Sequence, residues 1–290
     1  MGLPSWPVIA DIFDGALVVA VVATVLTLGL SMTMGEVLAS VRRRRLFVAL
    51  ILVNVLVIPV LAWAIATAMP LSRAQTAAML VSTAGAGGAG GLKATQLARA
   101  NLPLAVTLVI ALQLTNLVVL PAWLHVALPA ATIETAPLLA RLVGLILVPL
   151  ALSMLVRARW PGSAWLVGPL VRLCDVSIVV ALVAGVVSTR MQIAAAMHGW
   201  FIPSALLVVG VAMAMGALPG RRVRADRDTG ALVSGMRFAA LALIVIGAQS
   251  GDSATYLAPA LVYALLDLAV AIGAGLLLGR RSRQLVPMAP

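Results

Sequence analysis

Long apolar runs follow one another along nearly the whole chain, and they decide which folds are open to it. A helix needs about 20 residues to cross the roughly 30 Å hydrocarbon core of a bilayer. Nine runs reach that length, at approximately 15–35, 46–69, 73–100, 102–128, 136–156, 165–188, 193–218, 229–251 and 254–279. Only 10% of the residues are charged, whereas soluble domains carry about 25%. The sequence therefore predicts an all-α polytopic membrane protein with nine transmembrane helices, forming one unit over residues 1–290.

Charged residues divide between the two ends of these runs. One end holds Arg42–Arg45, Arg99, Arg157, Arg159, Arg221, Arg222, Arg224, Arg227, Arg280, Arg281 and Arg283. The other end holds Asp11, Asp14, Glu134 and Asp252, with Arg73 and Arg190 as its basic residues. Since loops rich in Lys and Arg stay in the cytoplasm, we expect an outer N-terminus, a cytoplasmic C-terminus and multi-pass insertion in the inner membrane. The same loops account for the net charge of +11, so nucleic acid is not an expected partner.

Residues that would support catalysis or metal binding are scarce. The chain has one cysteine, Cys174, and two histidines, His125 and His198, neither of which has a metal-ligand partner at helical spacing. The hydrolase motifs Gly-x-Ser-x-Gly and His-Glu-x-x-His are absent from the sequence. We expect no enzymatic activity, no metal site and no cofactor.

The third apolar run contains a stretch that disfavours a helix. Its glycines are Gly85, Gly87, Gly88, Gly90 and Gly91. Each glycine costs a helix roughly 1 kcal/mol relative to alanine, so the stretch predicts a break within 73–100. Backbone freed from a helix persists in a bilayer only where protein or an aqueous cavity covers it. Broken helices hold substrate and coupling ion in many secondary transporters, so we expect a transport site near Gly91 and Lys93.

The eighth run, 229–251, offers a partner for this break. Gly235 lies two residues before a basic residue, Arg237, just as Gly91 lies two residues before Lys93. The predicted topology gives the two runs opposite orientations. Interrupted helices at equivalent places in oppositely oriented halves are the signature of an inverted repeat. We therefore expect a second broken helix, with Met236 and Arg237 at its break.

Three segments resemble the bile acid:sodium symporter family. They are G-G-A-G-G-L-K-A-T-Q-L-A-R-A-N-L-P-L-A-V-T-L at 87–108, T-L-G-L-S-M-T at 27–33 and G-M-R-F-A-A-L-A-L at 235–243. The resemblance implies a panel domain and a core domain, with two broken helices that cross at mid-membrane in the core. It also implies ten helices, or nine when the first is missing, and the smaller number fits this chain.

The chain departs from the family at the positions that bind sodium. The resemblance implies oxygen ligands from a Ser-Asn pair after the first break and from Glu and Gln around the second. Those positions hold Gly91, Leu92, Val233 and Arg237 in this sequence. Sodium needs several hard oxygen ligands, as other hard cations do, and Lys93 and Arg237 would repel it. The sequence therefore favours the transporter fold and makes sodium a doubtful partner.

Lys93, Arg237 and Asp267 are charged residues inside predicted spans, where charge is costly and marks a functional candidate. Lys93 either belongs to the site or extends its ammonium group to the cytoplasmic surface. Arg237 belongs to the site or to a structural ion pair. Asp267, at a position where the family has Asn, is either the counter-charge of one of these cations or a proton carrier. Arg172 and Asp175 are expected to pair locally, because they are three residues apart on one helix.

Polar residues on neighbouring helices complete the candidate site. Thr95 follows Lys93 after the break, while Gln113 and Asn116 lie in the middle of the fourth run. Their side chains either line a substrate cavity or make hydrogen bonds between helices.

The basic residues favour an anionic substrate, and the resemblance implies organic acids and steroid conjugates. We therefore expect a secondary transporter of a small organic anion, a carboxylate or a sterol conjugate, that works without sodium. Protonation of a desolvated Lys93 would couple transport to protons. Otherwise the two cations only bind the anion, and transport is uniport or exchange. The alternatives are a sodium-coupled symporter with a rearranged ion site, and a membrane channel or sensor.

Overall fold

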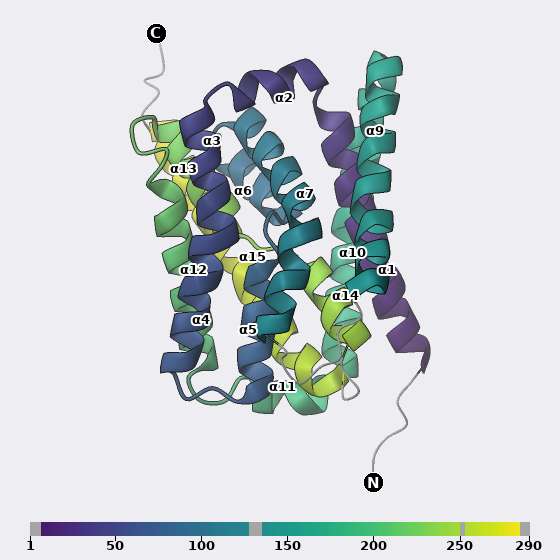
Figure 1. The fold of residues 1–290 in the computed structure, drawn as a ribbon, viewed down its shortest axis with the longest axis vertical. Helices are drawn as coiled ribbons and strands as arrows, with labels where there is room; N and C mark the ends of the chain where they lie inside the picture. The colour runs from purple at the N-terminus through teal and green to yellow at the C-terminus, as the bar shows by residue number, and fades with distance from the viewer. Residues whose placement is uncertain (1–6, 128–134, 250–252, 285–290) are drawn as a thin grey trace.

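The computed structural model describes residues 7–127, 135–249 and 253–284, and every regular element among them is helical (Figure 1). The α-helices are α1 (Pro7–Ser31), α2 (Met34–Val41), α3 (Arg44–Leu52), α4 (Ile58–Ala68), α5 (Arg73–Ala84), α6 (Ala89–Ala98), α7 (Leu102–Ala127), α8 (Thr135–Leu142), α9 (Val148–Arg159), α10 (Val167–Ser188), α11 (Arg190–Ala196), α12 (Phe201–Ala217), α13 (Arg224–Gly235), α14 (Ala239–Gln249) and α15 (Ser253–Gln284). Short π-helical turns, η1 (Val53–Val57) and η2 (Val143–Leu147), join α3 to α4 and α8 to α9, and a 3₁₀ turn, η3 (Pro161–Leu166), precedes α10. The all-helical membrane fold predicted from the sequence is confirmed for the described residues.

Within the described residues, six continuous helices are long and apolar enough to cross a membrane. They span 8–31, 44–68, 102–125, 136–159, 161–188 and 255–281. A seventh span is formed if α11 and α12, which are bent by 75° at their junction, count as one. Each of these agrees in position with a predicted run. The two remaining runs correspond to pairs of short helices, so the count of nine spans stays a prediction.

These two runs are broken helices, as the glycines predict. Helix α5 ends at Ala84 and α6 begins at Ala89, while α13 ends at Gly235 and α14 begins at Ala239. Helix α13 begins at Arg224, before the predicted start at 229, because its first turn is polar and an apolar pattern does not include it. Asp226 lies in that turn, where an acidic residue stabilises the positive end of a helix.

The two breaks contact each other directly. The amide of Phe238 donates to the carbonyl of Gly85 at 2.8 Å, and Ala86 forms an isolated antiparallel bridge with Arg237. These bonds satisfy backbone groups that the interrupted helices leave unpaired. The broken helices therefore meet through their main chains.

Asn101, which links α6 to α7, fastens the first broken helix to the start of the second. Its backbone amide donates to the hydroxyl oxygen of Thr229 at 2.8 Å, and its side-chain nitrogen donates to Asp226 at 2.8 Å. Asp226 is buried and also pairs with Arg43 at 2.6 Å. The ends of α6 and α13 are thus tied together at a distance from the breaks.

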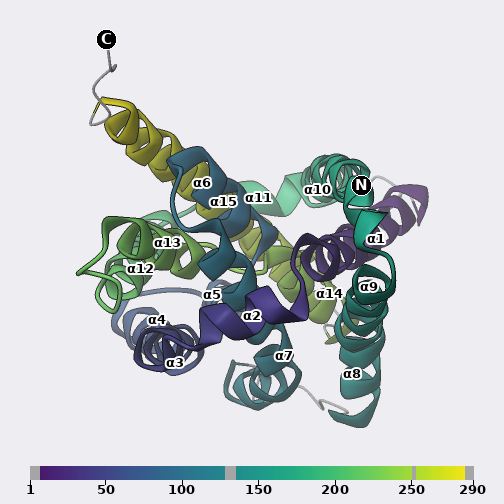
Figure 2. The same cartoon turned by 90° about the horizontal axis from the view of Figure 1, so that it is seen from above.

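Seen from above, α1, α8, α9 and α10 form a group on one side of the bundle (Figure 2). Helices α3, α4, α12 and α13 form a second group, and α5 and α14 lie between the two. Helix α1 begins at the end of the molecule opposite to the one where α15 finishes (Figure 1). The division into panel and core domains, and the side that faces the cytoplasm, stay predictions.

Candidate functional site

The glycines of the first break are required by close contacts and by backbone conformation. Gly87 has φ of +81°, which L side chains rarely adopt. A Cβ at Gly88 would lie 2.3 Å from the carbonyl oxygen of Arg237, so only glycine permits the two breaks to touch. Gly91 begins the next turn, where its carbonyl accepts a hydrogen bond from the Thr95 hydroxyl at 2.7 Å.

Glycines on both sides of the contact make room for methionine side chains. A Cβ at Gly90 would lie 2.4 Å from Cε of Met236. A Cβ at Gly235 would lie 2.3 Å from Cγ of Met213, on α12. Gly90 and Gly235, part of the glycine pattern that predicted the broken helices, therefore also allow tight packing around the second break.

The two amide side chains of α7 bind the backbone of the first break. Asn116 accepts from the amide of Ala86 at 3.2 Å and donates to the carbonyl of the same residue at 2.9 Å. Gln113 donates to the carbonyl of Gly87 at 2.9 Å. Two roles were open for these amides, lining a cavity or bonding between helices, and the structure shows hydrogen bonds from α7 to the freed backbone of the first break.

Arg237 is 1% exposed, and its guanidinium group is held by oxygen atoms. It donates to the side-chain oxygen of Asn54 at 3.0 Å, to the carbonyl of Asn54 at 3.1 Å and to the carbonyl of Thr83. Asn54 lies in the π-helical turn η1, and its own nitrogen donates to Ser234 at 2.8 Å. The side chain of Arg237 therefore fastens η1, the end of α5 and the second break to one another.

Asp267 contacts the backbone of Arg237 and not its guanidinium group. One carboxylate oxygen, Oδ2, accepts from the amide of Arg237 at 2.8 Å. Among the described residues, Asp267 forms no ion pair with Arg237 or with Lys93. Asp267 is therefore not in contact with either cationic side chain, as a counter-charge would be. It binds a neutral backbone amide at the second break instead.

Lys93 forms an ion pair with Asp175, on α10. The two side chains are 47% and 44% exposed. The predicted local pair of Arg172 with Asp175 is wrong, because α10 turns Asp175 toward α6 and Lys93 reaches it there. Lys93 is also less desolvated than the proton-coupling hypothesis requires.

A cavity of about 510 Å³ opens beside this ion pair. Most of its lining is apolar and comes from α1, α6, α7, α10, α14 and α15. The predicted site residues in its lining are Gly88, Gly90, Leu92, Lys93, Met236 and Arg237. The predicted site residues outside its lining are Gly87, Gly91, Thr95, Gln113, Asn116, Gly235 and Asp267.

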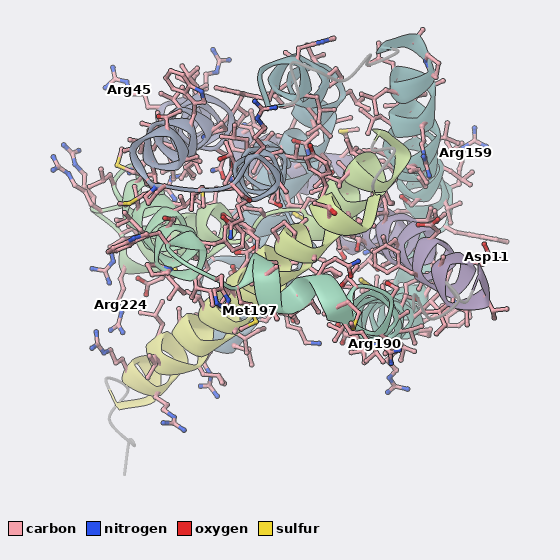
Figure 3. All side chains as sticks on the ribbon, turned by 90° about the horizontal axis from the view of Figure 1, so that it is seen from below. Asp11, Arg45, Arg159, Arg190, Met197 and Arg224 are labelled. Carbon is pink, nitrogen blue, oxygen red and sulfur yellow. The ribbon has the colours of Figure 1, made fainter. Side chains whose placement is uncertain are left out.

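The charged groups of the cavity lining balance one another. Its basic residues are Lys93 and Arg237, and its acidic residues are Asp175 and Glu36. Hydrogen bonds from the backbone and side chain of Thr33 lower the pKa of Glu36, which supports its negative charge. Basic residues on the edges of the molecule point elsewhere: Arg45, Arg159, Arg190 and Arg224 extend outward at the periphery when the bundle is viewed from below (Figure 3).

Sequence reasoning missed the residues that complete the site from distant helices. Thr83 contributes its backbone carbonyl oxygen, so the type of its side chain does not reveal this role. In the sequence, Asp175 resembles a residue that pairs with Arg172 on the same helix. Thr24 on α1 lines the cavity beside Cys174, with 3.1 Å between the hydroxyl and the thiol sulfur. Their contribution depends on how α1 and α10 pack, which no local pattern records.

Comparison with known proteins places the chain in one family. A search of curated proteins found no match. The sequence model of the Sodium Bile acid symporter family matches residues 18–199, which is well over half of the chain. This region includes the first broken helix, α5 and α6, and ends before the second. The chain therefore belongs to the sodium bile acid symporter family and is a membrane secondary transporter.

Proposed function

We propose that this protein transports a small organic anion, a carboxylate or a sterol conjugate, without sodium. The position of Lys93 carries the proposal. Its ammonium group is about half exposed, lines the cavity of about 510 Å³ and lies one turn beyond the first break. Pockets of a few hundred Å³ hold small ligands, and a few polar groups in an apolar lining fix their orientation. The anionic group of the substrate would bind Lys93, while its apolar body would fill the rest of the cavity.

The charge balance of the lining favours an anion with a single charge. A substrate carboxylate would replace Asp175 as the partner of Lys93, which exchanges one ion pair for another. A second negative charge would face Glu36 and the released Asp175 without another exposed cation in the described lining. We therefore expect a monoanion with a large apolar body to be preferred over a dicarboxylate.

The oxygen contacts of Arg237 support transport without sodium. Its guanidinium group already donates hydrogen bonds to three oxygen atoms at the crossing of the broken helices. A free cation nearby would be repelled by this fixed charge, which the low dielectric of a buried site leaves poorly screened. Arg237 thereby supplies, as part of the chain, the positive charge that a bound ion would bring to the crossing.

The proposal assigns Lys93 to anion binding, because its exposure removes the desolvation on which proton exchange by this residue depended. Transport is then uniport or exchange unless another group couples it to an ion. We retain nine spans, an inverted repeat, panel and core domains, a cytoplasmic C-terminus and an inner-membrane location as parts of the proposal.

The experiment is uptake by the purified full chain in liposomes. We use radiolabelled cholate as the probe, because it joins one carboxylate to a large apolar body. Uptake should be equal in sodium and choline media, and liposomes loaded with cholate should exchange it. Lys93→Gln should reduce uptake by up to about fivefold, since an ion pair of a half-exposed side chain is worth up to about 1 kcal/mol. Lys93→Arg should retain most of it.

Three results would contradict the proposal in different ways. A strict sodium requirement would favour a symporter with a rearranged ion site. Uptake without exchange of pre-loaded cholate would favour a channel. Stabilisation of the protein by cholate in a thermal-shift assay, with no uptake, would favour a sensor.

A further inference from the structure

Three polar atoms are left unpaired where α15 passes the second break. They are Oδ1 of Asp267, Oη of Tyr263 and Nε of Arg237. The three residues are at most 1% exposed, and none of these atoms has a hydrogen-bond partner among the described residues. Buried polar groups in folded proteins are nearly always bonded, so each exception requires an explanation. Three such exceptions on neighbouring residues suggest that this cluster has a functional role.

The paired oxygen of Asp267 connects this cluster to the break. Oδ2 accepts from the amide of Arg237 at 2.8 Å, and that residue also forms the bridge with Ala86. A charged acceptor makes a stronger hydrogen bond than a neutral one. The charge on Asp267 therefore affects how firmly α15 holds the place where the broken helices meet.

The charges of Asp267 and Arg237 are both buried without an ion pair between them. The side-chain hydrogen bonds of Arg237 end on neutral oxygens of Asn54 and Thr83, and Asp267 binds a neutral amide. The ionisable residues beside Asp267 include Arg237, whose amide it binds, and Tyr263, one helical turn earlier on α15. A buried carboxylate that lacks a contacting counter-charge is costly, and taking up a proton removes that cost.

We propose that Asp267 is the proton-binding site of this transporter. A proton from water in the cavity adds to Oδ1, which forms an O–H group, while Oδ2 keeps the amide of Arg237 as a weaker, neutral acceptor. No other bond forms or breaks, and the net charge of Asp267 and Arg237 together changes from zero to plus one. Asp267 lies outside the cavity lining, but Ala264 and Leu268, three residues before it and one residue after it on α15, belong to that lining.

This proposal rests on the proposed function for its physiological meaning, but the proton site is testable without any substrate. Infrared difference spectroscopy of the full chain in lipid detects the carbonyl stretch of a protonated carboxyl group. In the native protein, a band of this kind should appear as the pH is lowered. It should be lost in Asp267→Asn and kept in Asp175→Asn, which removes a half-exposed carboxylate of the cavity lining.

Two further variants keep the test decisive if Asp267→Asn does not fold. Asp267→Glu should retain the band at a shifted frequency, and Tyr263→Phe should retain it with an altered titration midpoint. The proposal is overturned if Asp267→Asn or Asp267→Glu leaves the band unchanged, or if no band titrates in the native protein. Cholate uptake distinguishes the two failures: uptake that ignores a pH gradient contradicts only the proton site, and absent uptake contradicts the proposed function.

Discussion

Asn116 binds both backbone polar groups of a single residue, Ala86, in the first break. Its oxygen accepts from the Ala86 amide and its nitrogen donates to the Ala86 carbonyl. The side chain thus replaces the helical neighbours that Ala86 lost when the helix was interrupted. A bilayer offers no water to take their place, so this support is a condition for the break to exist.

Asn116→Ala should therefore destabilise the protein strongly. Leaving a buried polar group unpaired costs about 1–3 kcal/mol, and this substitution leaves two. The unfolding transition in detergent should shift to a clearly lower temperature. Thr115→Ala is the matched control, because the Thr115 hydroxyl donates to the carbonyl of Ala111 in its own helix. Equal shifts for the two variants would contradict the assignment.

Gly88→Ala should prevent the broken helices from meeting. The added Cβ would lie 2.3 Å from a backbone oxygen of Arg237, which cannot move away as a flexible side chain could. We expect loss of folded protein or of uptake. Gly210→Ala on α12 introduces the same methyl group where no atom lies within 4 Å, and it should be tolerated. Full uptake by Gly88→Ala would show that the contact is dispensable.

Asp175→Asn should increase the affinity for monoanions, because it releases Lys93 from its ion pair. Exposed ion pairs contribute up to about 1 kcal/mol, so cholate binding should tighten by no more than about fivefold. The thermal stability of the protein should change little for the same reason. Arg172→Gln, on the same helix, should leave cholate binding unaltered. Weaker binding by Asp175→Asn would mean that this carboxylate serves the substrate itself.

Replacing Val233 by Glu together with Arg237 by Gln restores the side chains that the family resemblance implies around the second break. Removing the fixed positive charge and adding a carboxylate should create affinity for sodium. A ligand that binds only the folded state stabilises it in proportion to ln(1 + [L]/Kd). Sodium chloride should therefore raise the unfolding temperature of the double variant above that in potassium chloride, with no such difference in the native chain. A sodium response already present in the native chain would contradict our assignment of Arg237.

The sequence predicted the broken helices because glycine acts locally: Gly87 needs a positive φ, and Gly88 needs the space of a missing side chain. The roles of Gln113 and Asn116 were not predictable in the same way. A polar residue in the middle of a span can face a cavity or a neighbouring backbone, and only packing decides. Asp175 was assigned to the wrong partner because spacing along one helix gives no information about α6. Local conformation is readable from the chain, whereas partners from distant helices are not.

The bridge between Ala86 and Arg237, and the bond from Phe238 to Gly85, are made by main-chain atoms, which every amino acid possesses. The crossing of the broken helices therefore does not depend on which side chains occupy the neighbouring positions Leu92 and Val233. A lineage could exchange oxygen ligands for apolar or cationic residues there and still inherit the same scaffold. In this architecture, ion dependence can be altered by mutation without first dismantling the fold.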